Sequence, residues 1–312
     1  MQGVFFDETM KNKLLVISGQ TATGKTKLGV YLAKKYDGEI VSFDARQAYR
    51  YLDIVTGKER ADIPIWLYDV VDPKEYISAY DFCQKAEIVI KDIIKRGKLP
   101  IIVGGSVFYI KTFLHGVQSA GIAPDWNARK KLEILDVYSL QTMLSSCDLS
   151  RLTAMNESDK VNKRRLIRAI EVAKGQSKKD IYPKKKDPYD VLFIALVARN
   201  KKILEGAIGK RVEERMRMGV LVEVKTLLGR GYAASDPGLS TIGYRQLLLY
   251  IEEKISLGVA KEAWIREEMQ YAKRQYTFLK KMPGVHFFDT KDTHLIEKID
   301  TIVYKWLYDS KN

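Results

Sequence analysis

The sequence predicts an α/β protein in which a parallel β-sheet is covered by helices on both faces. Short apolar runs of strand length alternate with longer segments whose apolar residues recur at helical spacing, and this alternation is typical of parallel sheets. The first run, at 13–17, is followed by a glycine-containing loop and an amphipathic segment with lysines on its polar face. With 312 residues the chain is long enough for one large domain or two ordinary ones.

Each strand is expected from an apolar run that ends at polar or turn-forming residues. The first run, KLLVI, stops at Ser18 and Gly19. The second, EIVSF, ends directly before Asp44, which therefore lies at the carboxyl end of the expected strand. Helical patterns lie between the runs, and Ser106 is expected to be the N-cap of one of them. The expected strands are 13–17, 39–43, 99–103 and 191–198, and the helices between them are 25–36, 44–52, 81–97 and 106–116.

The alternation stops beyond Gly116, and residues 117–187 show only helical patterns. Within them, residues 151–187 carry twelve Lys or Arg against five Asp or Glu, which is +7 of the chain's total of +14. After the strand at 191–198, helical patterns cover 201–282, with a break at 229–238. We therefore expect a core domain made of residues 1–117 and 188–312 and a basic helical insertion domain at 118–187.

The excess of basic residues, with a pI near 9.4, favours a polyanionic partner, above all a nucleic acid. The longest apolar run, Val191–Ala198, is far shorter than the roughly 20 residues that a membrane-spanning helix needs. The first residues do not resemble an export signal, so we expect a cytoplasmic protein without a membrane segment. Cys83, Cys147 and the three histidines lack metal-ligand spacing, which excludes a structural zinc site.

Residues 19–26, GQTATGKT, match the phosphate-binding P-loop pattern G-x-x-x-x-G-K-[ST] in full, between an expected strand and an expected helix. Gly19 and Gly24 let successive N–H groups point inward, and the N-terminus of the helix adds positive potential. Lys25 can neutralise phosphate oxygens, and Thr26 can ligate Mg²⁺. The sequence therefore predicts a P-loop NTPase-like sheet that binds a di- or triphosphate. The loop serves phosphoryl transfer and pyrophosphate departure alike, so other residues must decide the chemistry.

Asp44 is expected at the same edge of the sheet as the P-loop, where α/β proteins bind their ligands. A carboxylate there is a candidate base, and its position leaves the nucleophile open, since a kinase would use it to accept a hydroxyl proton. Local sequence supports equally well a role for Asp44 as N-cap of the helix expected at 44–52.

Several blocks of the sequence together resemble the tRNA dimethylallyltransferases, also called tRNA isopentenyltransferases. The blocks follow one another in the family's order over most of the chain, and their combination is far more specific than the P-loop alone. They are GQTATGKT at 19–26, EIVSFDARQAYRYLDIVTGK at 39–58, GGSVFYIKTFLHG at 104–116, KRRLIRAIEV at 163–172, STIGYRQLLLYIE at 240–252 and YAKRQYTFLKK at 271–281.

The resemblance implies transfer of a dimethylallyl group from dimethylallyl pyrophosphate to N6 of the adenosine immediately 3′ of the tRNA anticodon. We expect a monomer. Asp44 would act as the base, together with Lys25, Thr21 and Arg215 in catalysis. The pyrophosphate and its Mg²⁺ would be held by Gly19, Gln20, Thr21, Ala22, Thr23, Gly24, Lys25 and Thr26, with Thr26 as the metal ligand. The anticodon stem-loop would contact Asp44, Ala45, Arg46, Gln47, Ser106, Arg129, Arg164, Arg165, Leu166, Ile167 and Arg168.

The chain departs from the usual pattern of this family at several positions. Ile65 and Trp66 stand where members usually carry two histidines, and Gln20 stands where proline is usual. Ser106 replaces a threonine, and Phe278 replaces a tryptophan. The zinc finger that extends eukaryotic members is missing, which indicates the bacterial type.

Three other functions share part of these features. An isopentenyltransferase that modifies free AMP, ADP or ATP would need the P-loop and Asp44 but no basic insertion. A small-molecule kinase would bind ATP in the same loop. An RNA-binding protein without catalysis would not require an intact Gly24-Lys25-Thr26 or Asp44, so the transfer to tRNA is the preferred prediction.

Overall fold

The computed structural model describes residues 12–116, 122, 125–175 and 189–309. The described residues form two compact units. The core unit contains residues 12–77, 81–113 and 189–309, and the helical unit contains residues 78–80 and the described part of 114–175.

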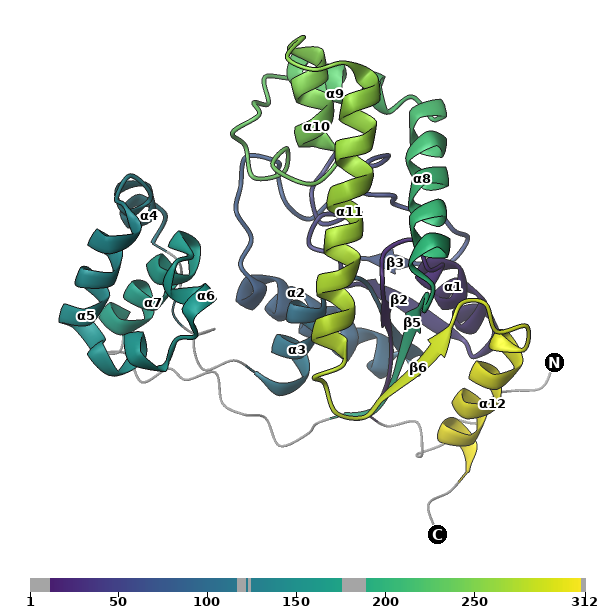
Figure 1. Cartoon of the computed structure of the whole chain (residues 1–312). Helices are drawn as coiled ribbons and strands as arrows, with labels where there is room; N and C mark the ends of the chain where they lie inside the picture. Colours follow the sequence, from purple (N-terminus) through teal and green to yellow (C-terminus); the bar gives the residue numbers. More distant parts are fainter. Residues whose placement is uncertain (1–11, 117–121, 123–124, 176–188, 310–312) are drawn as a thin grey trace. The chain divides into compact units, whose positions relative to one another are not determined.

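A six-stranded sheet forms the centre of the core unit, with the order β3-β2-β4-β1-β5-β6 (Figure 1). Every pair of neighbouring strands is parallel, so the expected α/β class is confirmed. The four expected strands are present, and two edge strands are added to them. The bounds are β1 Lys13–Gly19, β2 Gly38–Ser42, β3 Ile65–Trp66, β4 Leu99–Val103, β5 Asp190–Val197 and β6 Val285–Asp289.

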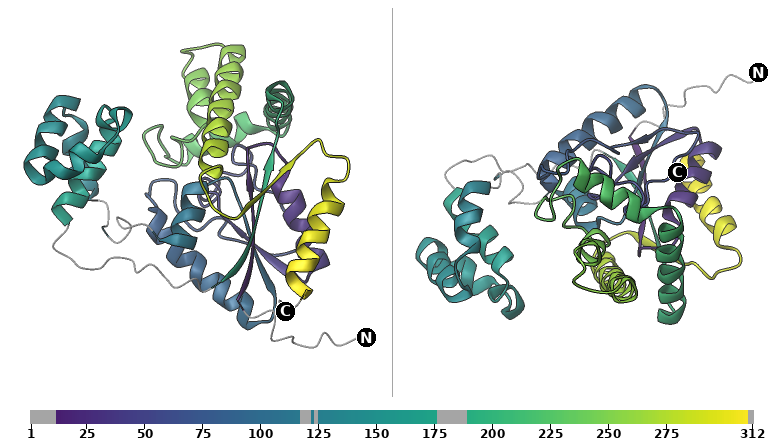
Figure 2. Two further views of the ribbon diagram at one scale, coloured as in Figure 1. Left: turned by 60° about the horizontal axis from the view of Figure 1, so that its bottom comes forward. Right: turned by 90° about the horizontal axis from the view of Figure 1, so that it is seen from above.

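Helices cover both faces of this sheet (Figure 2). On one face α1 (Lys25–Lys35) and α12 (Leu295–Tyr308) pack through Leu32 and Val303 against the apolar side chains of the strands. On the other face lie α2 (Ala79–Lys95) and α3 (Val107–His115), whose Phe82 and Phe113 pack edge to face against Phe43. This burial holds the carboxyl ends of the strands at one edge.

Four further helices of the core unit are α8 (Lys201–Arg217), α9 (Val220–Gly229), α10 (Tyr244–Ile251) and α11 (Leu257–Leu279). Helix α8 follows β5, and its N-terminus is capped by the side chain of Asn200, which accepts hydrogen bonds from the N–H groups of Lys202 and Ile203. Helix α11 runs beside α8 and also contacts β1 (Figure 1). Residues of α8 and α11 are therefore placed next to the end of β1.

The helical unit contains α4 (Trp126–Glu133), α5 (Val137–Ala154), α6 (Glu157–Lys160) and α7 (Lys163–Gly175). Its own small core is formed by Leu140 and Leu144 of α5 and by Leu166, Ile167 and Ile170 of α7. All regular structure among its described residues is helical, as the sequence predicts. No described helix of either unit is long and apolar enough to span a membrane.

The helix expected at 44–52 is wrong, because these residues form turns. An Asp44 carboxylate oxygen accepts a hydrogen bond from the Arg46 N–H at 3.0 Å, which closes a turn that competes with a helix. Further along, Tyr49 pairs with Val71 as an isolated parallel bridge. Asp44 is therefore not a helix N-cap. Ser106 does directly precede α3, as expected, but its hydroxyl accepts from the N–H of Ala45 at 3.0 Å and so holds the turn after β2.

Candidate active site

The P-loop leaves the end of β1 and enters the N-terminus of α1. Gly19 has φ 142°, and a Cβ at this position would lie 2.1 Å from the Leu196 carbonyl oxygen, so only glycine fits. Gly24 has φ 81° immediately before α1. The first turn of α1 carries no acidic residue, so its positive end is available to an anion.

Two glutamine side chains fix the start of the loop. The Ala198 N–H donates to Gln20 Oε1 at 2.8 Å, so the residue that stands where the family usually has proline ties the loop to the end of β5. The Thr21 N–H donates to Gln275 Oε1 at 2.8 Å, while Gln275 Nε2 donates to the Gly105 carbonyl at 2.9 Å. Gln275 of α11 thereby links the P-loop to the loop that follows β4.

Several cations meet at the P-loop. Lys25 Nζ donates to the Gln20 carbonyl at 2.7 Å, and burial, followed by repulsion from Arg211, lowers the pKa of Lys25 to about 8. Arg211 Nη2 donates to the Thr21 hydroxyl at 2.6 Å. Arg215 is only 6% exposed, and burial, followed by the like charge of Arg211, lowers its pKa to about 9. These groups concentrate positive charge away from solvent.

One buried carboxylate lies among these cations. Glu268 of α11 is 3% exposed, with Oε2 3.2 Å from Arg211 Nη2 and Oε1 3.9 Å from Arg46 Nη1. Arg46 also stacks on the ring of Tyr271, at 4.5 Å from its centroid. The Tyr271 hydroxyl donates to the Gly105 carbonyl at 3.0 Å, which orients the ring.

The charges in this cluster are not balanced within the described part of the chain. Arg211 Nε is buried and has no hydrogen-bond partner there. Arg215 packs beside the Trp264 ring at 5.8 Å, and no described carboxylate lies within ion-pair distance of it. Buried cations normally carry a matched anion. An anionic ligand next to the P-loop would supply the missing charge.

Asp44 lies at the same edge of the sheet, two residues after β2 and at the start of the turn that follows this strand. One carboxylate oxygen accepts a hydrogen bond from the Arg46 N–H, and the other has no hydrogen-bond partner among the described residues. Gln47, in contrast, is 9% exposed and accepts from the Ser42 hydroxyl at 2.8 Å. Its Nε2 donates to the Thr56 and Gly57 carbonyls at 3.2 and 3.1 Å, so Gln47 holds the loop in place. Asp44 therefore has one carboxylate oxygen available to a ligand.

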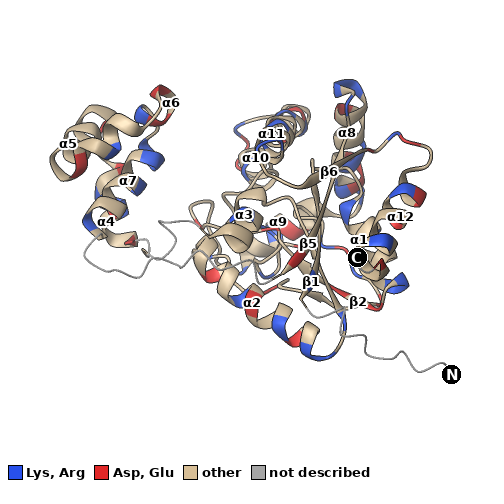
Figure 3. Ribbon diagram, turned by 90° about the horizontal axis from the view of Figure 1, so that it is seen from below, with Lys and Arg blue, Asp and Glu red and all other residues tan. Residues whose placement is uncertain are grey.

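The remaining predicted RNA-contacting residues lie on α4 and α7 of the helical unit, and Figure 3 shows the Lys and Arg positions of these helices in blue. Arg164 and Arg165 of α7 are exposed, and Arg165 pairs with Asp159 at 2.8 Å. The side chains of Leu166 and Ile167 fill the core of this unit, so they cannot offer a surface to RNA. Their packing places the neighbouring Arg164 and Arg165 at the surface of the unit.

Arg129 and Arg168 are engaged inside the helical unit. Arg129 donates two hydrogen bonds to the Glu171 carboxylate, at 2.6 and 2.8 Å, and stacks 4.6 Å from the Trp126 ring centroid. Arg168 donates to Glu171 at 3.0 Å and to the Ile122 carbonyl at 2.8 Å. Both arginines therefore stabilise the unit itself.

Sequence reasoning missed Arg211, Glu268 and Gln275. Arg211 precedes Arg215 by four residues, and Glu268 precedes Gln275 by seven, so each pair shares one face of its helix. This spacing was available in the sequence. The packing of α8 against α11 that brings the two faces together was not.

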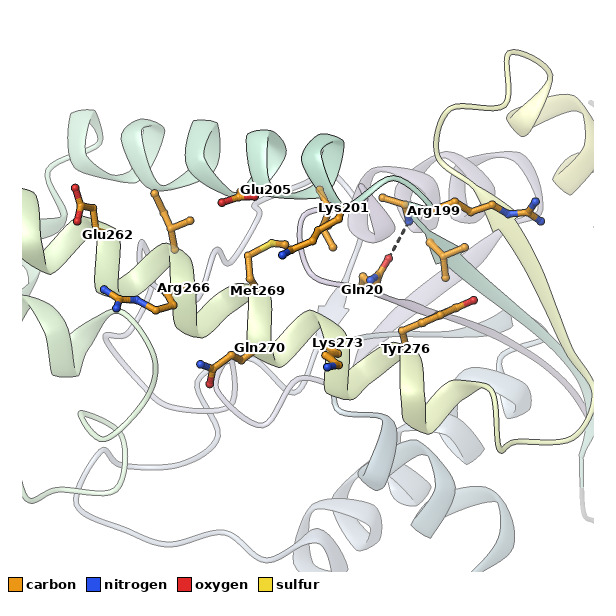
Figure 4. Close-up of a pocket in the computed structure, with 14 residues that line it drawn as sticks. Gln20, Arg199, Lys201, Glu205, Glu262, Arg266, Met269, Gln270, Lys273 and Tyr276 are labelled. Carbon is orange, nitrogen blue, oxygen red and sulfur yellow. Dashed lines mark hydrogen bonds between the residues drawn. The ribbon is translucent and has the colours of Figure 1, made fainter.

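A cavity of about 930 Å³ lies between α8 and α11 and borders the P-loop at Gln20 (Figure 4). Its lining includes apolar side chains such as Leu204, Ile265 and Met269. Lys201, Lys273 and other charged residues also line it. The P-loop is thus bordered by a cavity at Gln20.

The loop between β1 and α1, at the carboxyl edge of a parallel sheet, defines a P-loop NTPase-like protein with a site for a phosphorylated ligand. Residues 47–282 match the family model described as IPP transferase. The chain therefore belongs to the IPP transferase family.

Two relatives span nearly the same length as this chain. The tRNA dimethylallyltransferase of Thermoanaerobacter sp. (strain X514) is 33% identical, and the match covers 96% of this chain and 98% of the relative. That of Leuconostoc mesenteroides is 37% identical, with 93% and 98% covered.

Two solved structures are also similar. The tRNA isopentenylpyrophosphate transferase of Bacillus halodurans has a TM-score of 0.71 and 32% identity, over 96% of this chain and 98% of that one. A eukaryotic dimethylallyltransferase, described as acting on tRNA, has a TM-score of 0.78 and 25% identity, over 96% and 80%.

Proposed function

We propose that this protein transfers the dimethylallyl group of dimethylallyl pyrophosphate to tRNA, at N6 of the adenosine immediately 3′ of the anticodon, and releases pyrophosphate. The observation that carries the proposal is the unbalanced cluster of Lys25, Arg211 and Arg215 at the P-loop, beside the free carboxylate oxygen of Asp44. The names of the similar proteins support tRNA as the acceptor.

The cations act on the leaving group. The bond between C1 of the dimethylallyl group and the pyrophosphate oxygen breaks, and its electron pair stays with the pyrophosphate. Lys25, Arg211 and Arg215 lie where this charge develops, and the P-loop N–H groups add fixed dipoles. Because these groups are already in place and largely removed from water, they reorganise little during the reaction.

Asp44 acts on the nucleophile. The exocyclic amine of adenine is a poor nucleophile inside a stacked strand, so the base must leave its stack and enter the site. Asp44 then orients the amine and accepts its proton as the bond between N6 and C1 forms. The turn held by Ser106 and Gln47 keeps the carboxylate at the sheet edge.

The residues at the P-loop fit a bound Mg²⁺. The Thr26 hydroxyl has no hydrogen-bond partner among the described residues, and Mg²⁺ is commonly held by one or two protein oxygens together with substrate phosphates. When bound, the ion neutralises charge on the pyrophosphate. No cluster of three His, Cys, Asp or Glu residues suited to a metal is present in the described residues, so substrate oxygens would complete the coordination.

The helical unit is proposed to hold the anticodon stem-loop through its exposed basic side chains. Arg164 carries no ion pair to a described residue, and Arg165 can exchange Asp159 for a phosphate. Contacts of this kind position RNA without reading its sequence. We further propose that the enzyme works as a monomer in the cytoplasm.

The experiment is transfer of label from radioactive dimethylallyl pyrophosphate to an unmodified tRNA with adenosines 3′ of its anticodon, with AMP as a parallel acceptor. We expect labelled tRNA and unlabelled AMP. Asp44→Asn, which keeps the side-chain shape, should lower the rate by about 10²–10⁴-fold. Asp62→Asn is the matched control, because Asp62 pairs with Lys34 on the surface and should leave the rate unchanged. Label on AMP alone, or on neither acceptor, would contradict the proposal.

A further inference from the structure

Glu268 lies where three arginines from two other segments converge. Its carboxylate is 3.2 Å from Arg211 of α8 and 3.9 Å from Arg46 in the turn after β2. Arg215, one helical turn beyond Arg211, contributes to the same electrostatic environment. With a side chain only 4% exposed, Glu268 is the one described carboxylate that forms ion pairs with Arg46 and Arg211.

The position of Glu268 compensates repulsion among the arginines. Three guanidinium groups at close quarters repel one another strongly where water is excluded. Although burial alone would raise the pKa of Glu268, the charges of Arg211, Arg46 and Arg215 together lower it, so the carboxylate stays ionised. The arginines can therefore remain close together before any ligand binds.

Glu268 is also connected to the P-loop. The Thr21 hydroxyl accepts a hydrogen bond from Arg211 Nη2 at 2.6 Å, and the same nitrogen donates to Glu268 Oε2 at 3.2 Å, so Arg211 links the carboxylate to the loop. Gln275, on the same face of α11, accepts from the Thr21 N–H. One face of α11 thus fixes the loop and the arginines relative to each other.

We propose that Glu268 is a positioning residue that holds Arg46, Arg211 and Arg215 around the P-loop until the pyrophosphate group of the substrate replaces it as their main counter-ion. The inference rests on the proposed function, because it takes pyrophosphate as the anion. It predicts that an anion at the P-loop can substitute for the carboxylate of Glu268 in stabilising the fold.

The test compares thermal unfolding of the whole protein with and without inorganic pyrophosphate and Mg²⁺. Glu268→Gln removes the charge and keeps the shape, so without pyrophosphate its Tm should fall. Pyrophosphate should bind this variant on the order of tenfold more tightly than the wild type, because it no longer competes with the carboxylate. The pyrophosphate-induced rise in Tm should then be about 3 °C larger than in the wild type.

A matched control is available at the opposite edge of the sheet. Glu39 at the start of β2 is also 3% exposed and pairs with Arg96, while Trp66 Nε1 donates to it at 2.8 Å. Glu39→Gln should lower the Tm as well, but its response to pyrophosphate should equal that of the wild type. Glu268→Asp, which retains the charge, should recover most of the wild-type behaviour.

Kinetics give a second readout. With disordered arginines, Glu268→Gln should lower kcat for dimethylallyl transfer by at least about tenfold, while the KM for dimethylallyl pyrophosphate does not rise. If Glu268 merely filled space, both constants would stay near their wild-type values, because glutamine keeps the shape of the side chain.

Three outcomes would decide against the proposal or its basis. Equal pyrophosphate responses of Glu268→Gln and the wild type would overturn the role of Glu268. Absence of any response in the wild type would instead refute the pyrophosphate site itself. If Glu268→Gln does not fold, the charge-balanced double variant with Arg215→Met should fold, and its failure to do so would also overturn the proposal.

Discussion

Each of the two units contains arginines gathered around a buried glutamate, and the two clusters differ in how completely their polar groups are matched. In the helical unit, Glu171 receives two hydrogen bonds from Arg129 and one from Arg168. In the core unit, Glu268 lies at 3.2 Å from Arg211 and 3.9 Å from Arg46.

The partners of the arginines differ in the same way. Arg129 also stacks on Trp126, and Arg168 also bonds the Ile122 carbonyl. In the core unit, Arg211 Nε is buried without a described partner, and Arg215 has no ion pair to a described residue. A cluster in which every arginine has its polar partners stabilises the fold. A cluster at the sheet edge with unpartnered arginine groups is suited to binding an anion. Arginine count and burial alone do not separate the two.

The largest expected effect is on Arg215 in the unmatched cluster. Arg215→Met removes a cation from the site where charge develops, so kcat/KM for dimethylallyl pyrophosphate should fall about 100-fold. Stability should not decrease, because an unpaired buried charge is lost. Arg129→Met should show the reverse, with lower stability and unchanged pyrophosphate binding. Steady-state kinetics and thermal unfolding of both variants check this, and a stability loss in Arg215→Met would contradict it.

The matched cluster should matter mainly for folding. Glu171→Gln leaves Arg129 and Arg168 without their carboxylate, which should destabilise the helical unit by about 2 kcal/mol, less than for a fully buried pair because both arginines are partly exposed. Hydrogen exchange of the α7 amides measures this local stability. Pyrophosphate affinity should stay at the wild-type value, and a change in it would remove the distinction between the clusters.

The pH dependence sharpens the comparison at the P-loop. Burial, followed by repulsion from Arg211, lowers the pKa of Lys25 to about 8, so this ammonium group loses its proton above pH 8 in the free enzyme. Since pyrophosphate binds the protonated form, kcat/KM should be constant below that pH and fall about tenfold per unit above it. The curve for kcat should be flatter, because bound pyrophosphate raises the pKa of Lys25. A flat profile of kcat/KM to about pH 9.5 would contradict this role.

The smallest effect is expected on the exposed surface of α7. Arg164→Ala should weaken tRNA binding only a few-fold and reduce the slope of log K against log salt by about one. Arg165→Ala should have less effect, because Arg165 must first leave Asp159. Filter binding at several salt concentrations measures both variants. An unchanged salt slope for Arg164→Ala would place the RNA elsewhere.

Most of the fold follows from local patterns in the sequence. The buried strands and the P-loop are predicted because their apolar runs and glycine spacing leave few alternatives. Edge strands β3 and β6 are not, since β3 has two residues and the side chains of β6 are partly or fully exposed. The segment 44–52 has a helical pattern, but the Asp44 turn and the Tyr49–Val71 bridge override it.

Residues of the candidate site can be predicted from the sequence only where a single segment of the chain determines their position. The P-loop and Asp44 each follow directly from a strand, so their shared edge can be inferred. Arg46, Arg211 and Glu268 are far apart in the sequence and meet only through the packing of α8 and α11 at the sheet edge. Conversely, Leu166 and Ile167 lie in a basic segment, and only the structure reveals that their side chains are buried.

The arrangement of cations before substrate arrives has a consequence for turnover. In the proposed reaction, Lys25, Arg211 and Arg215 would bind the pyrophosphate group whether it is still esterified or already free, so the site would hold its product by the same contacts as its substrate. Product inhibition competitive with dimethylallyl pyrophosphate follows. Release of pyrophosphate, rather than formation of the bond to N6, would then limit the rate of each cycle.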